Sequence, residues 1–164
     1  MEYIVVGFLL IGVIIGLFFL IFNMDGKVLE KKYPPMKEYE MSILESKVFN
    51  SINNYRLSLG LKKLITDTYT SRQCIDQVIQ SLSRGVTSHD GFPKRYMNIK
   101  NNVPANTISE IVSSGFTTTE AVVNGFKNSP KHYDTLIGDY SHMGICVKPD
   151  SNGKLYTCII NIKV

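Results

Sequence analysis

The sequence predicts an α+β domain with a small antiparallel sheet, preceded by one transmembrane helix. Helical patterns occupy the first part of the polar region and strand patterns close the chain, without the regular strand–helix alternation of a parallel sheet. Residues 3–22 contain 17 apolar residues, three glycines and no charge. The rest of the chain, about 140 residues, suits one compact domain. This composition excludes a polytopic membrane protein, a disordered chain and a fibrous repeat.

The N-terminal apolar run is interpreted as a retained single-span anchor at residues 3–23. Glu2 and Asp25 are separated by 22 uncharged residues, enough to cross a hydrocarbon core of about 30 Å. A cleavable signal peptide normally has a basic start, a shorter apolar region and a small-residue cleavage site, and none of these is present. We therefore expect the lipid bilayer to be a partner. Gly12 and Gly16 have GxxxG spacing, which can support a homodimer, although glycine is also common in single spans.

The charges that flank this run do not fix the side of the membrane on which the domain lies. Four lysines follow the run and none precedes it, which favours a cytoplasmic domain by the positive-inside rule. Acidic residues are interleaved with these lysines, and whole domains often cross regardless of flanking charge. Residues 24–40 are interpreted as a stalk stiffened by Pro34 and Pro35, and residues 41–164 as the folded domain.

Two helices are expected at the start of the domain. Apolar residues recur at three- and four-residue steps through residues 41–59, and Gly60 is a natural helix end. A second helix is expected from about residue 67 to residue 84, followed by Gly85. Its predicted apolar stripe consists of Ile75, Val78, Ile79 and Leu82. Residues 88–93 are rich in turn formers and predict a turn.

The second half of the domain is predicted to contain strands and two short helices. Residues 107–112 alternate between polar and apolar and predict a strand. Thr117 and Glu120 have capping-box spacing and predict the start of a helix. Ser129 and Pro130 predict the N-cap and first position of another, ending at Gly138. Residues 143–148 and 154–163 predict two strands of a hairpin.

Charge and cysteine usage narrow the classes of partner. The net charge is +4 and the basic residues are scattered, so we expect no nucleic-acid partner. The cysteines, Cys74, Cys146 and Cys158, have neither CxxC nor zinc-site spacing. If residues 151–153 form a three-residue hairpin loop, Cys146 and Cys158 lie opposite each other and can form a disulfide. Two reduced, buried thiols are equally consistent with the sequence.

Four polar residues are candidates for chemistry. His89 lies in the predicted turn, Glu110 in an apolar strand, and His132 in the first turn of a short helix that begins at Ser129. A buried carboxylate costs free energy unless it is paired or binds a metal. Imidazole and carboxylate ligands suit zinc or another divalent ion, and the same groups can act as general acid and base. Spacing alone does not distinguish such a cluster from polar residues that are satisfied locally.

Five short motifs occur in a fixed order between residues 45 and 162. They are Asn53-Asn54-Tyr55-Arg56 with residues 60–64, Ser88-His89, Glu110, residues 120–132 ending in Ser129-Pro130-Lys131-His132, and residues 143–147 with 156–160. Together they resemble the CAP superfamily, the SCP-like domain of cysteine-rich secretory proteins, antigen 5 and plant pathogenesis-related proteins. The resemblance is greatest to the small, cysteine-poor bacterial branch.

The resemblance implies a three-layer α-β-α sandwich and a central cleft in which His89, Glu110 and His132 meet. In some members of the family such a cleft holds zinc or another divalent ion. Ser129 falls near the place of a second acidic residue in eukaryotic members, so the resemblance implies three protein ligands here. Phe126 replaces the family's usual tryptophan. Because the family is mostly extracytoplasmic, the resemblance favours a domain outside the cytoplasm, against the lysine count.

Three functions follow as hypotheses. The first is a membrane-tethered module whose cleft binds a lipid, sterol, glycan or peptide, with or without a divalent metal. The second is a metal-assisted hydrolase, with His89 and His132 as ligands and Glu110 as ligand or general base. The third is a non-catalytic membrane scaffold. The family offers no general reaction and the sequence supplies no independent nucleophile, so we favour binding over catalysis.

Overall fold

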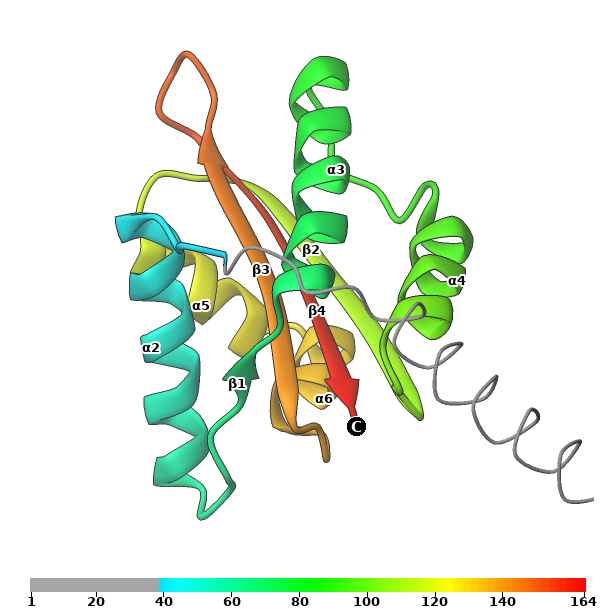
Figure 1. Cartoon of the computed structure of the whole chain (residues 1–164). Helices are drawn as coiled ribbons and strands as arrows, with labels where there is room; N and C mark the ends of the chain where they lie inside the picture. The colour runs from blue at the N-terminus through cyan, green and yellow to red at the C-terminus, as the bar shows by residue number, and fades with distance from the viewer. Residues whose placement is uncertain (1–38) are drawn as a thin grey trace, which may run out of the picture. The chain divides into compact units, whose positions relative to one another are not determined.

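The structure is a computed structural model that describes residues 39–164 (Figure 1). The expected membrane span at residues 3–23, with Gly12 and Gly16, lies outside the described residues, as does the stalk up to residue 38. Between residues 39 and 164, no helix has both the length and the apolar character needed to span a bilayer.

The described chain contains five helices and a four-stranded sheet. In chain order the elements are α2 (Ile43–Ser58), β1 (Ile65–Thr66), α3 (Thr68–Arg84), α4 (Phe92–Asn102), β2 (Thr107–Phe116), α5 (Thr119–Lys127), α6 (Pro130–Ile137), β3 (His142–Pro149) and β4 (Leu155–Lys163). The predicted helices at 41–59 and 67–84, the short helix after Ser129, the strand from residue 107 and the closing hairpin are therefore confirmed.

The sheet is mixed rather than purely antiparallel. Its strand order is β1-β3-β4-β2, and β4 pairs antiparallel with both β2 and β3. The two-residue strand β1 pairs parallel with β3, so the prediction of a wholly antiparallel sheet is wrong at this edge. A strand of two residues is too short to show the alternation on which the prediction depends.

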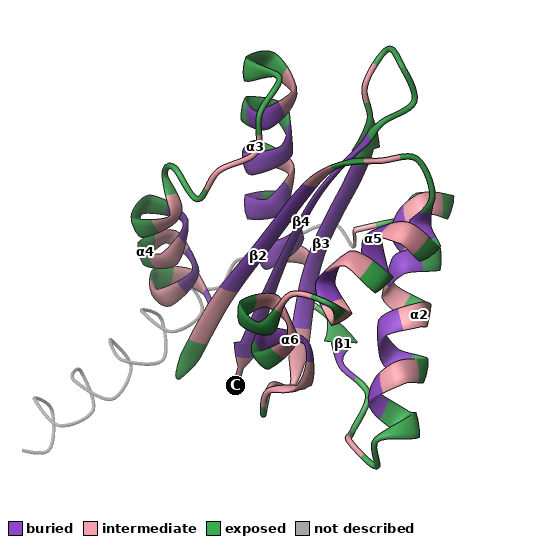
Figure 2. Cartoon of the chain, turned by 180° about the vertical axis from the view of Figure 1, so that it is seen from behind, coloured by how far each residue is buried: buried purple, intermediate pink, exposed green. Residues whose placement is uncertain are grey.

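Helices cover both faces of the sheet, which gives the three layers that the family resemblance implies (Figures 1 and 2). On one face, Ile111 and Ile159 pack against residues of α2 and α5 such as Val48 and Phe126. On the other face, the core is made with α3 and α4. The buried residues of this second core include Cys74, Val78, Ile99, Val112, Cys146, Cys158 and Ile160. Alternate residues of each strand thus enter different cores.

Two details of the helices concern their caps. The N-cap of α5 is Thr118, whose hydroxyl accepts from the Ala121 backbone N–H, so the predicted capping box of Thr117 and Glu120 is wrong. Three consecutive threonines offer the same chemistry in adjacent registers, and the sequence does not distinguish them. The helix α2 does begin with a capping box, formed by Ser42 and Glu45.

The buried face of α3 is largely polar. Its buried residues are Thr70, Ser71, Gln73, Cys74, Gln77, Val78 and Ser81. Of the predicted apolar stripe, Val78 is buried and Ile75 and Leu82 are half-buried, whereas Ile79 is 53% exposed. The predicted stripe is therefore wrong at Ile79, because small polar side chains face the sheet and bring α3 close to it.

The helix α4 is not predicted by the sequence pattern. It starts after Gly91, which has a φ of 76°, and it has a proline in its first turn. Only Arg95 and Ile99 are buried on it, so there is no apolar stripe to reveal a helix. Its importance lies in Arg95, which it carries to the sheet.

The predicted pairing of Cys146 and Cys158 is confirmed as a strand register but not as a disulfide. The two residues lie opposite each other in the β3–β4 ladder, and both thiols are free and buried, as is Cys74. Burial raises the pKa of all three thiols. The alternative of reduced core thiols therefore describes this structure.

Candidate functional site

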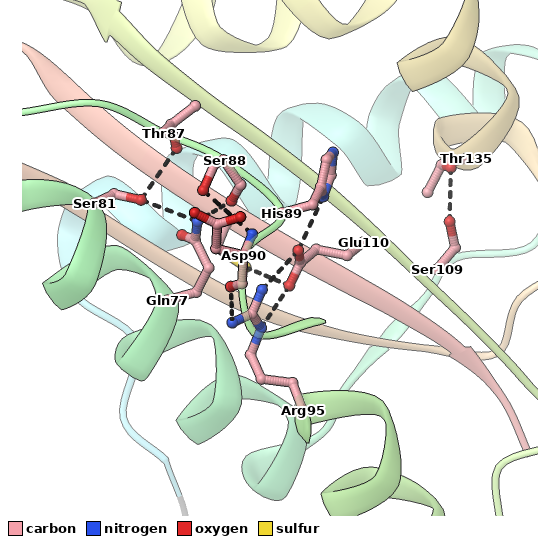
Figure 3. A network of polar contacts seen from close by, with 11 residues as sticks. Gln77, Ser81, Thr87, Ser88, His89, Asp90, Arg95, Ser109, Glu110 and Thr135 are labelled. Atoms are coloured by element: carbon pink, nitrogen blue, oxygen red, sulfur yellow. Dashed lines mark hydrogen bonds and ion pairs between the residues drawn. The ribbon is translucent and has the colours of Figure 1, made fainter. Parts of the chain in front are cut away.

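Glu110 is the centre of the candidate site. It lies in the middle of β2, and its side chain is 1% exposed. The guanidinium of Arg95, itself 5% exposed, donates from Nε to Oε2 at 2.7 Å and from Nη2 to Oε1 at 2.8 Å. This two-point geometry is the strongest common arrangement for an arginine and a carboxylate. The pair connects α4 to the sheet (Figure 3).

His89 reaches the same carboxylate from the loop between α3 and α4. Its Nδ1 lies 3.0 Å from Glu110 Oε1, while its side chain remains 55% exposed. The loop is fixed on both sides: Gln77 Nε2 donates to the Ser88 carbonyl at 2.7 Å, and Arg95 Nη1 donates to the Asp90 carbonyl at 3.0 Å. The carboxylate engages Nδ1 of His89, which leaves the other ring nitrogen, Nε2, available for a hydrogen bond to a ligand.

The buried side of Glu110 is closed by a thiol. Cys158 Sγ donates to Glu110 Oε2 over 3.8 Å, a weak contact typical of sulfur. Both carboxylate oxygens of Glu110 are therefore engaged by protein groups. Of the four side chains in this cluster, the imidazole of His89 is the one that is open to solvent.

His132 approaches from α6, on the other face of the sheet (Figure 2). Its ring lies edge-on to the Phe126 ring with centroids 5.3 Å apart. Burial lowers the pKa of His132, and the charge of nearby His89 lowers this pKa further. The two predicted histidines are thus electrostatic neighbours on either side of β2, without a hydrogen bond between them among the described contacts.

A model of the cysteine-rich secretory protein (CAP) family matches residues 49–160. The chain belongs to this family. The predicted resemblance is therefore confirmed at the level of the domain. No curated protein matches the sequence.

Solved bacterial structures show the same CAP fold. An outer surface protein from Borrelia burgdorferi matches with TM-score 0.65 and 22% identity over 78% of this chain and 98% of its own. An extracellular SCP-domain protein from Bacillus anthracis matches with TM-score 0.65 and 16% identity over 82% of this chain and 48% of its own. A cysteine-rich secretory protein from Staphylococcus aureus gives 0.63 and 18%, over 79% and 42% respectively.

As they are arranged, His89, Glu110 and His132 do not form a three-ligand site for a divalent metal. The Arg95 guanidinium already faces both oxygens of Glu110, so a positive charge lies where a metal bound by that carboxylate would have to lie. Across residues 39–164, no three His, Cys, Asp or Glu side chains are placed to hold a metal ion. A metal bound by Glu110 would therefore have to displace Arg95, and we assign no step to one.

Ser129 contributes less to the site than the sequence suggests. It is the N-cap of α6, but its hydroxyl makes no capping hydrogen bond. Within the described residues, no hydrogen bond joins it to His89, Glu110 or His132.

The residue that sequence reasoning misses is Arg95. A carboxylate in an apolar strand needs a cationic partner, and an arginine soon after the turn that holds His89 is a reasonable candidate. Nothing in the sequence shows that residues 92–102 form a helix, however, so the side of the sheet on which Arg95 lies is not predictable. Gln77, which fixes the histidine loop, gives no signal for a similar reason: it lies outside the apolar stripe predicted for this helix.

Proposed function

We propose that this CAP domain is a binding module, tethered at the cell envelope, that recognises a ligand at the edge of β2 between His89 and His132. The observation that carries the proposal is the half-exposed His89 imidazole held on a buried, fully engaged Glu110–Arg95 pair. The pair orients the imidazole rigidly, and rigid presentation of a hydrogen-bonding group favours recognition because little entropy is lost on binding.

The same geometry gives little support to hydrolysis. A general base needs a free lone pair, and both Glu110 oxygens face Arg95. A thiolate nucleophile needs a lowered pKa and an accessible sulfur. The thiols of Cys74 and Cys158 are buried, and burial raises their pKa. Binding needs only the exposed His89 imidazole, whereas hydrolysis would also need a nucleophile beside it, and the three thiols of the chain are buried.

The imidazole of His132 favours a ligand with uncharged polar groups. Because the pKa of His132 is lowered by burial and by His89, its ring is neutral at pH 7. A neutral imidazole offers one donor and one acceptor nitrogen. Hydroxyl groups of a glycan and amide groups of a peptide match this chemistry better than a purely apolar lipid or sterol does.

The proposed location rests on the sequence and on the names of the structural neighbours. Residues 3–23 have the length and composition of a single span. The neighbours are described as an outer surface protein, an extracellular protein and a secretory protein. We place the domain outside the cytoplasm on these grounds.

The proposal is tested by binding measurements on the full-length protein in detergent micelles. Panels of lipids, sterols, glycans and peptides are screened by native mass spectrometry, and each retained compound is titrated against His89→Gln and His132→Gln. We expect at least tenfold weaker binding for both variants. His142→Gln is the matched control, because His142 bonds Ser141 at the start of β3 and takes no part in the site.

Two results would contradict this function. One is retention of every bound compound with unchanged affinity by both histidine variants, which would place binding elsewhere on the molecule. The other is an absence of binding across all four panels, which would favour the scaffold hypothesis.

A further inference from the structure

Among residues 39–164, no strand neighbours the outer edge of β2. The strand order places β2 at the end of the sheet, paired only with β4. Figure 2 shows β2 between α4 on one side and α5 and α6 on the other, with no helix or strand of the described chain alongside its outer edge. It is a ten-residue strand, long enough to accept a further strand.

The register shows which residues of β2 point their backbone groups outward. On β3, the N–H groups of Ile145 and Val147 donate to side chains away from β4, so the even-numbered residues of β3 face β4. Because Cys146 lies opposite Cys158, the odd-numbered residues of β4 face β2, and Ile159 lies opposite Ile111. In an antiparallel ladder the remaining residues point away from the partner. These outward residues of β2 are Ile108, Glu110, Val112 and Ser114.

The opposite edge of the sheet, at β1 and β3, differs from that of β2 because its outward backbone groups are engaged. There, β1 pairs with the start of β3, and the side chains of Ser71 and Glu45 accept from the next two outward N–H groups. In the described chain no hydrogen bond reaches the outward backbone groups of β2. The sequence of β2 also lacks the lysine and proline that commonly block an exposed edge. Its edge protection is limited to the buried charge of Glu110 and a bulge between Ser114 and Phe116. Among the described residues, the fold therefore pairs one edge and leaves the outward backbone groups of the other unpaired.

We propose that the ligand of this CAP domain is an extended peptide that adds as a fifth strand along the outer edge of β2. Outward residues recur about every 6.6 Å along the strand, and each offers one donor and one acceptor. Only an extended backbone supplies matching groups at that interval, which a glycan or lipid does not. Side chains of the peptide then alternate between the faces of His89 and His132. This inference rests on the proposed function, since it assigns a ligand class to that site.

The experiment uses the full-length protein in detergent micelles and an array of random heptapeptides. The tightest binder is titrated by fluorescence anisotropy and then resynthesised with a single N-methyl group at each amide in turn. N-methylation removes a donor from the peptide and leaves the protein unchanged. We expect alternate positions to lose at least tenfold in affinity and the intervening positions to lose little, because only alternate amides face β2.

Ser114→Pro tests the protein side of the same contact. Proline at this position removes an outward N–H and leaves the ladder with β4 intact. The expected result is at least tenfold weaker binding of the heptapeptide, with Ser114→Ala unchanged as the matched control. Val112→Pro provides a second site nearer the centre of β2, and the N-methylated peptides remain informative if either proline variant unfolds.

Three results overturn the inference. The first is that no heptapeptide binds above background. The second is a heptapeptide whose affinity resists both N-methylation and Ser114→Pro. The third is self-association of the protein that Ser114→Pro abolishes, which would make a second copy the occupant of the edge. A glycan or lipid whose binding depends on His89 but not on Ser114 would refute the peptide and leave the proposed function standing.

Discussion

Glu110 is a carboxylate with almost no exposed surface. The hydrogen bonds and positive charge of Arg95 offset the cost of burying it. Replacing Arg95 with alanine leaves this charge buried without its cation, so we expect a loss of about 3 to 5 kcal/mol in the free energy of unfolding. Urea denaturation measures this loss. Lys94→Ala is the matched control, because Lys94 is the exposed neighbour on the same helix. A loss for Arg95→Ala no larger than that control would mean that the pair contributes little to stability.

The position of Arg95 also predicts how the site responds to zinc. Since the guanidinium already occupies the anionic side of Glu110, we expect the wild-type protein to bind no stoichiometric zinc at neutral pH. Isothermal titration calorimetry with zinc chloride checks this expectation. One equivalent bound by the wild type and lost in His89→Ala would restore the three-ligand site of His89, Glu110 and His132 that the family resemblance implies.

His132 is expected to make the free energy of unfolding decrease as the pH falls. Burial, and then the charge of His89, lower the pKa of His132 below its ordinary value of 6.5. As pH falls below 6.5, the unfolded chain takes up this proton more readily than the folded chain, so stability decreases until the lower folded-state pKa is passed. Above pH 7 both states are neutral and this contribution is absent.

Unfolding by urea at a series of pH values measures the effect. We expect His132→Gln to reduce the loss of stability between pH 7 and the acidic range, because glutamine does not titrate. His142→Gln should leave the wild-type pH dependence in place. If the two variants behaved alike, the acid sensitivity would have to come from other groups.

The two candidate-site histidines illustrate what the sequence can reveal about single residues. His89 and Glu110 are predicted to meet, and they do, at 3.0 Å. His132 is predicted to join them and lies near His89 without bonding to it. Arg95 is missed because a charged residue in a weakly patterned segment has no signature of its role. Types of residue are visible in a sequence, but the partner of a buried charge depends on packing.

Elements with long, regular patterns are predictable, and short or polar elements are not. The helix α2 and the closing hairpin follow from apolar periodicity and turn residues over many positions. The strand β1 has two residues and α4 buries only Arg95 and Ile99, so neither has a period to detect. The inner face of α3 is polar because it approaches the sheet closely, a property of the assembled layers.

The close approach of α3 to the sheet predicts how stability responds to one added methyl group at Gly144. A Cβ on Gly144 of β3 would overlap main-chain atoms of Thr70 and Ser71 at the start of α3, and main chain cannot move without shifting the helix. We expect Gly144→Ala to lower the free energy of unfolding by about 3 kcal/mol, the upper part of the usual range for overpacking. Thermal unfolding and urea titration both measure it.

Gly125 in α5 provides the comparison. A Cβ there would meet the ring of Phe116, a side chain that can rotate away. Gly125→Ala should therefore cost about 1 kcal/mol, near the lower end of the same range. If Gly144→Ala were the milder of the two, the helix α3 would be able to move on the sheet, and the fixed histidine loop that follows it would need another explanation.

At the scale of the whole molecule, the proposed membrane tether would make the side of the membrane decide which ligands the domain can meet. Flanking lysines favour the cytoplasm, whereas the location proposed above is outside it. The cysteines do not decide the matter, because free thiols buried with raised pKa values resist oxidation in either compartment. The same burial shields the native cysteines from reaction with a bulky thiol reagent.

Because the native cysteines do not react, a cysteine added at the surface can report on which side of the membrane the domain lies. Ser151 lies exposed in the turn between β3 and β4, so Ser151→Cys adds one reactive thiol to a chain whose own thiols do not react. In intact cells treated with a membrane-impermeant maleimide–polyethylene glycol, we expect a gel shift for Ser151→Cys and none for the wild type. Labelling of the variant only after permeabilisation would place the domain in the cytoplasm. It would also restrict the peptide proposed for β2 to intracellular proteins, because an extracellular segment could not reach the strand.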